Sequence, residues 1–211
     1  MSSTEVRAYH FVGKTLRDGS PVPPDGVWLV YDGPIVICKT GLHASKHPMD
    51  ALQYAPGETL CLVDCAGIVT EHHDKLACSR RRIVARFDAT GVLWEMARWS
   101  ALRVIHLWNA PQVVCNYLTT GDDSLRTAAW AAAHDAAQDT VWAASSRYAA
   151  WAAAWAASSQ AAALIGAWAA SRDAARAAAW AVSSQDATWD AQRDQFHTLV
   201  NAKFAKLMGN A

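Results

Sequence analysis

Alternating hydrophobic and polar positions in the first part of the chain predict short strands separated by turns. We expect strands at residues 8–12, 27–31, 35–38, 59–65 and 82–87. Glycines and prolines mark the loops between them, and the spacing from Leu93 to Trp108 predicts a helix. Ser45 is a candidate N-cap for a short helix that runs through Tyr54 and ends at Gly57. These elements predict a small mixed-sheet domain of the α+β class.

The pattern changes near residue 120. Residues 121–211 hold 33 alanines and seven of the eleven tryptophans, and they contain no proline. Helix is the only regular structure that this composition favours. We therefore predict an α+β domain over residues 1–120 and an all-helical, Ala/Trp-rich repeat domain over residues 121–211.

A 13-residue repeat runs through the helical part. Copies that read Trp-Ala-Ala-Ser begin at Trp142, Trp155 and Trp168, and a related copy begins at Ala181. Thirteen residues rotate a straight helix by roughly 220°, so successive tryptophans would not share a face. Two arrangements stay open: short helices that break near the serines, or a few longer helices that fold back on one another.

The segment from Ser184 to Met208 is typical of an amphipathic helix, with large apolar side chains recurring near one face. Helices this rich in alanine and tryptophan need partners, because alanine alone buries little apolar area. We expect them to form a bundle or to pack against a second copy of the chain as a homo-oligomer. The candidate interface residues are Trp142, Trp155, Trp168, Trp180, Trp189 and Phe196.

Charge and composition argue against several classes of protein. The chain has 19 basic and 19 acidic residues, so no overall charge favours nucleic acid. Tyr148 to Ser171 is uncharged and long enough to span a bilayer, but it is mostly alanine with polar residues near its centre, and we expect no membrane insertion. Five cysteines without paired spacing, and a first segment unlike a signal peptide, predict a cytoplasmic protein.

The cysteines and histidines of one stretch raise the question of a metal site. Cys61, Cys65, His72, His73 and Cys78 lie close together in the sequence. Their spacing matches no standard set of zinc ligands, and Cys61 and Cys65 share one face of a predicted strand, where packed thiols belong. We therefore predict no metal site from this pattern.

Three consecutive arginines and two histidines are the remaining candidates for chemistry. Arg80, Arg81 and Arg82 form the only basic cluster, together with Lys75 and Arg86. It either binds phosphates or an acidic partner, or is a solvated strand entry. His43 stands in a Gly-Leu-His-Ala-Ser turn and His10 on an alternating strand. Each histidine has a structural interpretation as well, as a loop-fixing or a core residue.

The segment from Cys38 to Val69 carries a recognisable succession of motifs. Gly41-Leu42-His43-Ala44-Ser45 is followed by Asp50-Ala51-Leu52, by Tyr54-Ala55 and by a hydrophobic strand that ends at Gly67. This segment resembles an uncharacterised domain family of bacteriophages and prophages. More distantly, roughly residues 8–69 are similar to the core of ADP-ribosyltransferases.

The resemblance to ADP-ribosyltransferases implies roles for two histidines. His10 would hydrogen-bond the nicotinamide-side ribose, and His43 would replace the tyrosine that stacks on nicotinamide. The family's third residue is a glutamate, and the strand from Arg82 to Asp88 contains none. Transfer chemistry without that carboxylate lacks its main electrostatic stabiliser. The resemblance therefore favours a binding module over an active transferase.

We expect a phage-encoded accessory protein of the bacterial cytoplasm that captures a nucleotide or ADP-ribose-like ligand and counters host defence signalling. No cofactor is expected, although NAD or a related nucleotide fits as a ligand. The alternatives are a protein-interaction or assembly module that acts through the helices, and an ADP-ribosyltransferase that uses NAD. The candidate ligand-binding residues are His10, Gly41, His43, Ser45, Tyr54, Arg80, Arg81 and Arg82.

Overall fold

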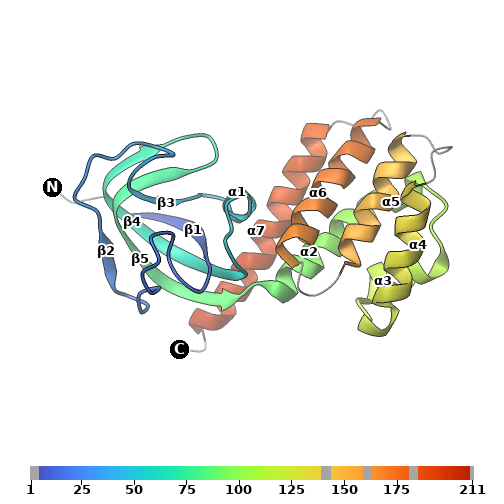
Figure 1. Cartoon of the computed structure of the whole chain (residues 1–211), viewed down its shortest axis with the longest axis horizontal. Coiled ribbons are helices and arrows are strands. Elements are labelled where there is room, and N and C mark those ends of the chain that lie inside the picture. Colours follow the sequence, from blue (N-terminus) through green and yellow to red (C-terminus); the bar gives the residue numbers. More distant parts are fainter. Residues whose placement is uncertain (1–4, 139–143, 159–162, 181–184, 210–211) are drawn as a thin grey trace. The chain divides into compact units, whose positions relative to one another are not determined.

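The chain is a mixed α+β protein, as expected, and it divides into two compact units (Figure 1). The computed structural model describes residues 5–138, 144–158, 163–180 and 185–209, without the side chains of residues 68, 178–180 and 185–187. The first unit contains residues 1–89 and 196–211, and the second contains residues 90–195. The boundary between residues 89 and 90 therefore lies about 30 residues before the change in composition. The second half of the last helix belongs to the first unit.

An antiparallel sheet forms the first unit. In the described residues its strands are β1 (Val6–Val12), β2 (Trp28–Val30), β3 (Leu42–Ala44), β4 (Thr59–Glu71) and β5 (Leu76–Asp88). The order is β1-β4-β5-β2, and β3 also pairs with β5. Tyr9 and Ser45 exchange backbone hydrogen bonds of 2.7 and 2.9 Å, which link β1 to the residue after β3. Strands β1, β4, β5 and β3 thus close into a ring, which we call the barrel.

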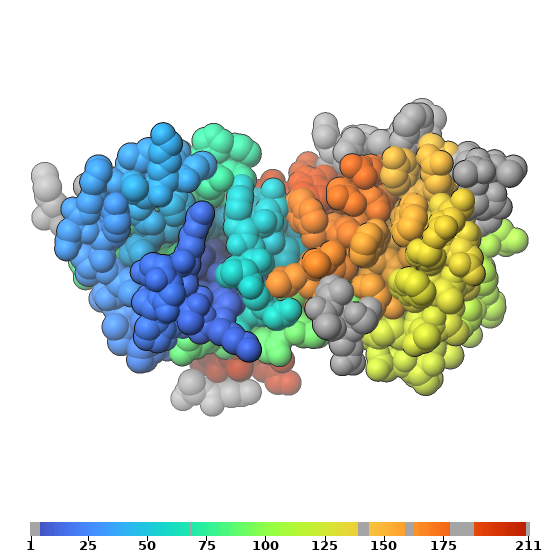
Figure 2. Space-filling view, viewed as in Figure 1, coloured from blue at the N-terminus to red at the C-terminus, as the bar shows by residue number. Residues whose placement is uncertain are grey.

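Small apolar side chains fill the inside of the barrel. Successive side chains of a strand point to opposite faces, so each strand contributes every second residue. The core residues are Ala8, Val12, Ala44, Cys61, Val63, Cys65, Leu76, Cys78 and Ile83. Residues 13–41 have little regular structure apart from β2, and they form much of the blue surface of this unit in Figure 2.

Two local expectations for this unit are wrong. Residues 35–38 form a turn instead of a strand, because the Thr40 hydroxyl donates to Pro34 O at 2.5 Å and accepts from Val36 N at 3.1 Å. Ser45 does not cap a helix, since its backbone pairs with Tyr9. Helix α1 (Pro48–Leu52) follows instead from His47, with proline in its first turn, and it ends well before Gly57.

The second half of helix α7 (Gln185–Gly209) covers the outer face of β1 and β5. The ring of Phe204, which is 1% exposed, meets the ring of Phe87 edge-on at 4.8 Å. The Tyr9 hydroxyl donates to Asn201 Oδ1 at 2.5 Å. A segment distant in sequence therefore completes the hydrophobic core of the first unit.

The second unit is helical throughout its described residues. Its helices are α2 (Thr90–Arg103), α3 (Gln112–Thr120), α4 (Arg126–Gln138), α5 (Ala144–Ala156), α6 (Ala163–Trp180) and the start of α7, with short 3₁₀ turns at Ile105–Leu107 and Asp123–Leu125. Buried alanines let these helices approach closely. Larger side chains supply specific contacts: the Tyr117 hydroxyl donates to Ala156 O at 3.0 Å, and Ser100 Oγ lies 3.1 Å from Ser171 Oγ.

The 13-residue repeat does not divide the chain at every serine, because Ser171 lies inside α6. Trp168 meets Trp189 edge-on at 5.4 Å, and Trp155 lies 6.4 Å from Trp151 between ring centroids. Phe196 is fully buried within the chain. Trp142 and the side chain of Trp180 lie outside the described residues. Of the candidate interface residues, Trp155, Trp168 and Trp189 therefore each contact another tryptophan within the chain.

One further property of the helices bears on the membrane question. In the part of the chain that the structure describes, no helix combines the length and the apolar character needed to cross a bilayer.

Candidate functional site

Arg81 is the central residue of the candidate site, and it points into the barrel. It pairs with Cys65 across the sheet and is only 6% exposed. Alternation turns its two neighbours to the other face, where Arg80 and Arg82 each lie over the Trp28 ring, 4.6 Å from its centroid. The three arginines therefore do not converge on one anion.

An ion-pair row on the outer face holds Arg82. Its guanidinium bonds Asp64 at 2.9 Å and Glu5 at 3.1 Å, and Arg7 bonds the same Asp64 at 2.7 Å. Asp64 is 3% exposed, so these bonds satisfy a buried carboxylate. The role of Arg82 is therefore structural. Of the three arginines, Arg81 is the one that still fits the prediction of a ligand-binding residue.

Arg81 has few partners for a buried cation. Its Nη1 donates to the backbone carbonyl of His43. No aspartate or glutamate of the described residues forms an ion pair with it. Burial lowers the pKa of Arg81, but an arginine side chain remains charged in a protein. A buried charge without a counter-charge is costly, so this arginine needs an explanation.

The charge of Arg81 affects the pKa values of two histidines, His10 and His43. Alternation places His10 on the same face of β1 as Ala8 and Val12, inside the barrel. Burial first, then the charge of Arg81, holds the pKa of His10 well below its usual range. The pKa of His43 is lowered by the same two causes in the same order. Both histidines are therefore neutral at physiological pH.

The His43 side chain points away from the core. Leu42 and Ala44 pack into the core, so alternation along β3 turns His43 to the opposite face. His43 Nε2 is buried and has no hydrogen-bond partner among the described residues. The structure thus brings His10, Arg81 and the backbone of His43 together, while the His43 ring faces another environment.

The thiols beside Arg81 do not supply a clear counter-charge. Burial raises the pKa of Cys61 to about 12. A hydrogen bond with Cys78, together with burial, raises the pKa of Cys65, whereas the same bond and then Arg81 lower that of Cys78. All three are free cysteines. Cys78 is therefore the one thiol of these three whose pKa is lowered overall.

The backbone conformation at Gly41 explains why a glycine stands there, without any contact to a ligand. It has a φ of +100°, a region that residues with a Cβ rarely adopt, and a Cβ would lie 3.0 Å from Ile35 Cδ1. This conformation turns the chain from the loop into β3. The glycine of the Gly-Leu-His-Ala-Ser motif is thus explained by geometry.

Replacing Gly41 with Ala is expected to destabilise the first unit by about 1–3 kcal/mol, the usual cost of a strained backbone conformation. Gly91→Ala is the matched control, because a Cβ there meets nothing within 4 Å. Gly91 lies in α2, so its replacement is expected to stabilise the chain by up to about 1 kcal/mol. Urea unfolding of both variants checks the two signs, and equal effects would contradict this role of Gly41.

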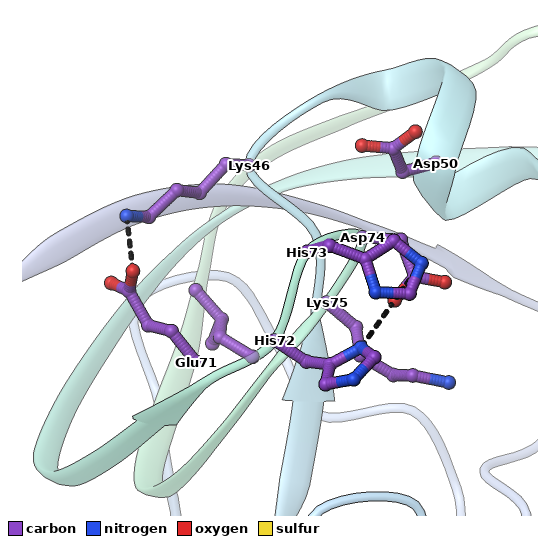
Figure 3. Close-up of a pocket in the computed structure, with 8 residues that line it drawn as sticks. Lys46, Asp50, Glu71, His72, His73, Asp74 and Lys75 are labelled. Atoms are coloured by element: carbon purple, nitrogen blue, oxygen red, sulfur yellow. Dashed lines mark hydrogen bonds and ion pairs between the residues drawn. The ribbon is translucent and has the colours of Figure 1, made fainter.

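A second group of polar residues surrounds the turn between β4 and β5, where a small pocket opens (Figure 3). The backbone N–H of His72 donates to Lys75 O at 2.8 Å and closes the turn. In Figure 3 the His72 and His73 rings lie beside the Asp74 carboxylate, with their centroids 4.2 Å apart, while Lys46 and Glu71 pair with each other at 2.6 Å. The pocket is lined by Lys46, Asp50, Glu71, His72, His73, Asp74, Lys75 and Leu76.

Tyr54 belongs to this second group and not to the group around Arg81. Its hydroxyl donates to Asp74 Oδ2 and accepts from Lys75 Nζ at 3.0 Å. The bond to Asp74 raises the pKa of Tyr54. We call Tyr54, His72, His73, Asp74 and Lys75 the hairpin cluster. Sequence reasoning missed Asp74, because it searched this stretch for sets of ligands that included the cysteines, and it grouped Lys75 with the arginines instead of with Tyr54.

Fold and site together define a small antiparallel barrel domain with a buried arginine, attached to a helical unit. Residues 6–95, from β1 into α2, match the model of a family described as a domain of unknown function, DUF7666. The match is consistent with an uncharacterised domain family and covers less than half of the chain. No curated protein and no solved structure matches the chain.

Proposed function

We propose that the first unit is a non-catalytic binding module for a phosphate-bearing ligand, and that Arg81 is the residue that binds the phosphate. The observation that carries the proposal is a buried guanidinium with one backbone partner and no carboxylate among the described residues. A phosphate would supply the missing counter-charge, and guanidinium and phosphate form strong bidentate hydrogen bonds.

The resemblance to phage domains and to ADP-ribosyltransferases supplies the ligand class. We propose a nucleotide or an ADP-ribose-like molecule, captured by a phage-encoded accessory protein to counter a host defence signal. Neutral His10 beside Arg81 supports this choice, since a neutral imidazole both donates and accepts hydrogen bonds. An ADP-ribosyltransferase-like fold and transfer activity are the alternative, which would need a carboxylate that β5 does not provide near Arg81.

A thermal-shift titration of the full-length chain tests the proposal. The ligands are NAD, ADP-ribose, cyclic dinucleotides and inorganic phosphate. At 100 times its Kd, a ligand that binds only the folded protein stabilises it by about 2.7 kcal/mol. We expect one of the nucleotides to raise Tm in the wild type and to leave Arg81→Met unshifted. Arg80→Met is the matched control from the same run of arginines, and its shift should equal that of the wild type.

The unliganded variants give a second readout. Methionine replaces a buried charge with a flexible apolar side chain, and such exchanges are often neutral or stabilising. Arg81→Met without ligand is therefore expected to unfold at the wild-type Tm or above it. A marked loss of stability would show that Arg81 has its counter-charge within the chain, most directly at Cys78, and would count against a ligand site.

A second function has its own supporting observation. Trp130 on α4 is 41% exposed and Ile165 on α6 is 63% exposed, although other residues of the same helices, such as Ala129 and Ala167, are buried. Exposed large apolar side chains on otherwise packed helices favour a protein-interaction or assembly module. If no nucleotide shifts the Tm of the wild type, this second function becomes the better hypothesis.

A further inference from the structure

The hairpin cluster is built like a metal site, and we propose that His72, His73 and Asp74 bind a divalent transition-metal ion of the Zn²⁺ class. One ligand atom from each of these residues lies within 4.8 Å of the other two. Two imidazoles and a carboxylate are a ligand set that suits zinc. This site is separate from the proposed phosphate site at Arg81.

The distances between the ligand atoms fit a common metal. Two bonds of about 2.0–2.2 Å at a tetrahedral angle span about 3.3–3.6 Å. His72 Nδ1 lies 3.3 Å from Asp74 Oδ1, and His73 Nε2 lies 3.7 Å from the same oxygen. Both nitrogens thus lie near the same carboxylate oxygen, and Figure 3 draws the contact that His72 makes with it. The three ligand atoms lie within 4.8 Å of one another, so side-chain rotation has to bring the farthest pair closer together around one ion.

Tyr54 holds the carboxylate in the orientation that this geometry needs. Its hydroxyl bonds Oδ2, so Oδ1 is the oxygen left to face the two imidazoles. Lys75 Nζ in turn donates to the Tyr54 oxygen at 3.0 Å and lies 4.3 Å from the centre of its ring. Oriented outer partners of this kind are a regular feature of metal sites. Tyr54 is therefore a positioning residue in the proposed site.

The charges around the pocket favour a cation over an anion. Its lining includes three carboxylates, from Asp50, Glu71 and Asp74, and two ammonium groups, from Lys46 and Lys75. The carboxylates thus outnumber the ammonium groups by one, and Glu71 neutralises Lys46 directly. The His73 side chain is 78% exposed, so an ion reaches the cluster from solvent. Three protein ligands leave a fourth position open for water or for a group of another molecule.

Calorimetric titration of untagged, full-length protein with ZnCl₂ tests this proposal. We expect one Zn²⁺ per chain, and loss of binding in both His72→Ala and Asp74→Asn. Tyr54→Phe should keep the stoichiometry but weaken affinity by about 10–100-fold, the usual effect of removing an outer partner. His106→Ala is the matched control, because His106 is another exposed histidine, and it should bind as the wild type does.

Two further measurements separate this site from its competitors. Co²⁺ added to the chain should give a spectrum without a thiolate charge-transfer band, because the proposed ligands include no sulfur. Arg81→Met should bind Zn²⁺ as the wild type does, whether or not Arg81 binds phosphate. The two proposals can therefore be tested separately. Absence of Zn²⁺ binding in the wild type, unchanged binding in His72→Ala, or binding lost with the exposed Cys38 in Cys38→Ser would each overturn the metal site.

Discussion

Phe204→Ala is expected to destabilise the first unit by about 3–5 kcal/mol, the usual cost of emptying a buried phenylalanine site. Phe204 is 1% exposed and contacts the rings of Tyr9 and Phe87, at centroid distances of 6.4 and 4.8 Å. These contacts attach the end of α7 to β1 and β5. A loss of this size is a large fraction of the stability of an ordinary domain.

Hydrogen exchange measured by mass spectrometry locates the effect of Phe204→Ala. Amides of β1, β4 and β5 should exchange faster in the variant, because the core that protects them has lost a large side chain. Leu207 lies three residues further along the same helix and is 40% exposed, which makes Leu207→Ala the matched control. Its effect should stay within about 0.5 kcal/mol. Similar exchange in the two variants would mean that α7 is not part of the first unit's core.

The dependence of the first unit on α7 explains why the two compact units differ from the change in composition. Alanine and tryptophan become frequent only after residue 120, whereas α2 already belongs to the helical unit from Thr90 onward. Alanine-rich composition marks helices that pack closely through small side chains. Helix α2 packs through larger side chains such as Leu93 and Trp94, so composition does not mark it as part of the helical unit. The second half of α7 packs against the barrel because its large apolar side chains, such as Val200 and Phe204, fit the outer face. Such a long-range contact leaves no local signal in the sequence.

Local patterning predicted the strands that alternate cleanly and missed those that do not. Strands β1 and β2 lie where they were expected, within two residues at each end. Strands β4 and β5 extend further than predicted, because their pairing continues beyond an irregularity between Ala66 and Val69, where Gly67 has a φ of +78°. Strand β3 is only three residues long and follows a glycine turn, so the pattern indicated a turn alone. Its pairing with β5 comes from tertiary contacts.

The candidate sites were predictable to different degrees. His10 and Arg81 stood out by residue type, but the inward orientation of Arg81 alone depends on its cross-strand partners, Cys65 and Leu29. The hairpin cluster depends on Tyr54, which lies 20 residues before Asp74 in the sequence and reaches it through the position of α1. Spacing rules for metal ligands contain no information about such an outer partner.

The first unit is expected to lose stability as the pH falls below about 6.5, the ordinary pKa of histidine. The pKa of His10 is well below this value in the folded chain, because burial and the charge of Arg81 oppose protonation. The unfolded chain therefore binds a proton that the folded chain does not. Stability is complete above the unfolded pKa and falls toward the folded pKa, by up to about 1.4 kcal/mol per pH unit for each such histidine.

Urea unfolding between pH 5 and 7 measures this effect, and two variants assign it to its source. His10→Phe keeps a ring of similar size but cannot be protonated, so it should remove most of the pH dependence in this range. His43→Phe should remove less, because the His43 ring is more exposed and its pKa is lowered less strongly. If His10→Phe keeps the full dependence, protonation elsewhere limits stability in acid. If the stability of the wild type does not change between pH 5 and 7, the barrel opens enough for water to reach His10. Water would then reach Arg81 as well, and Arg81 would need no phosphate to balance its charge.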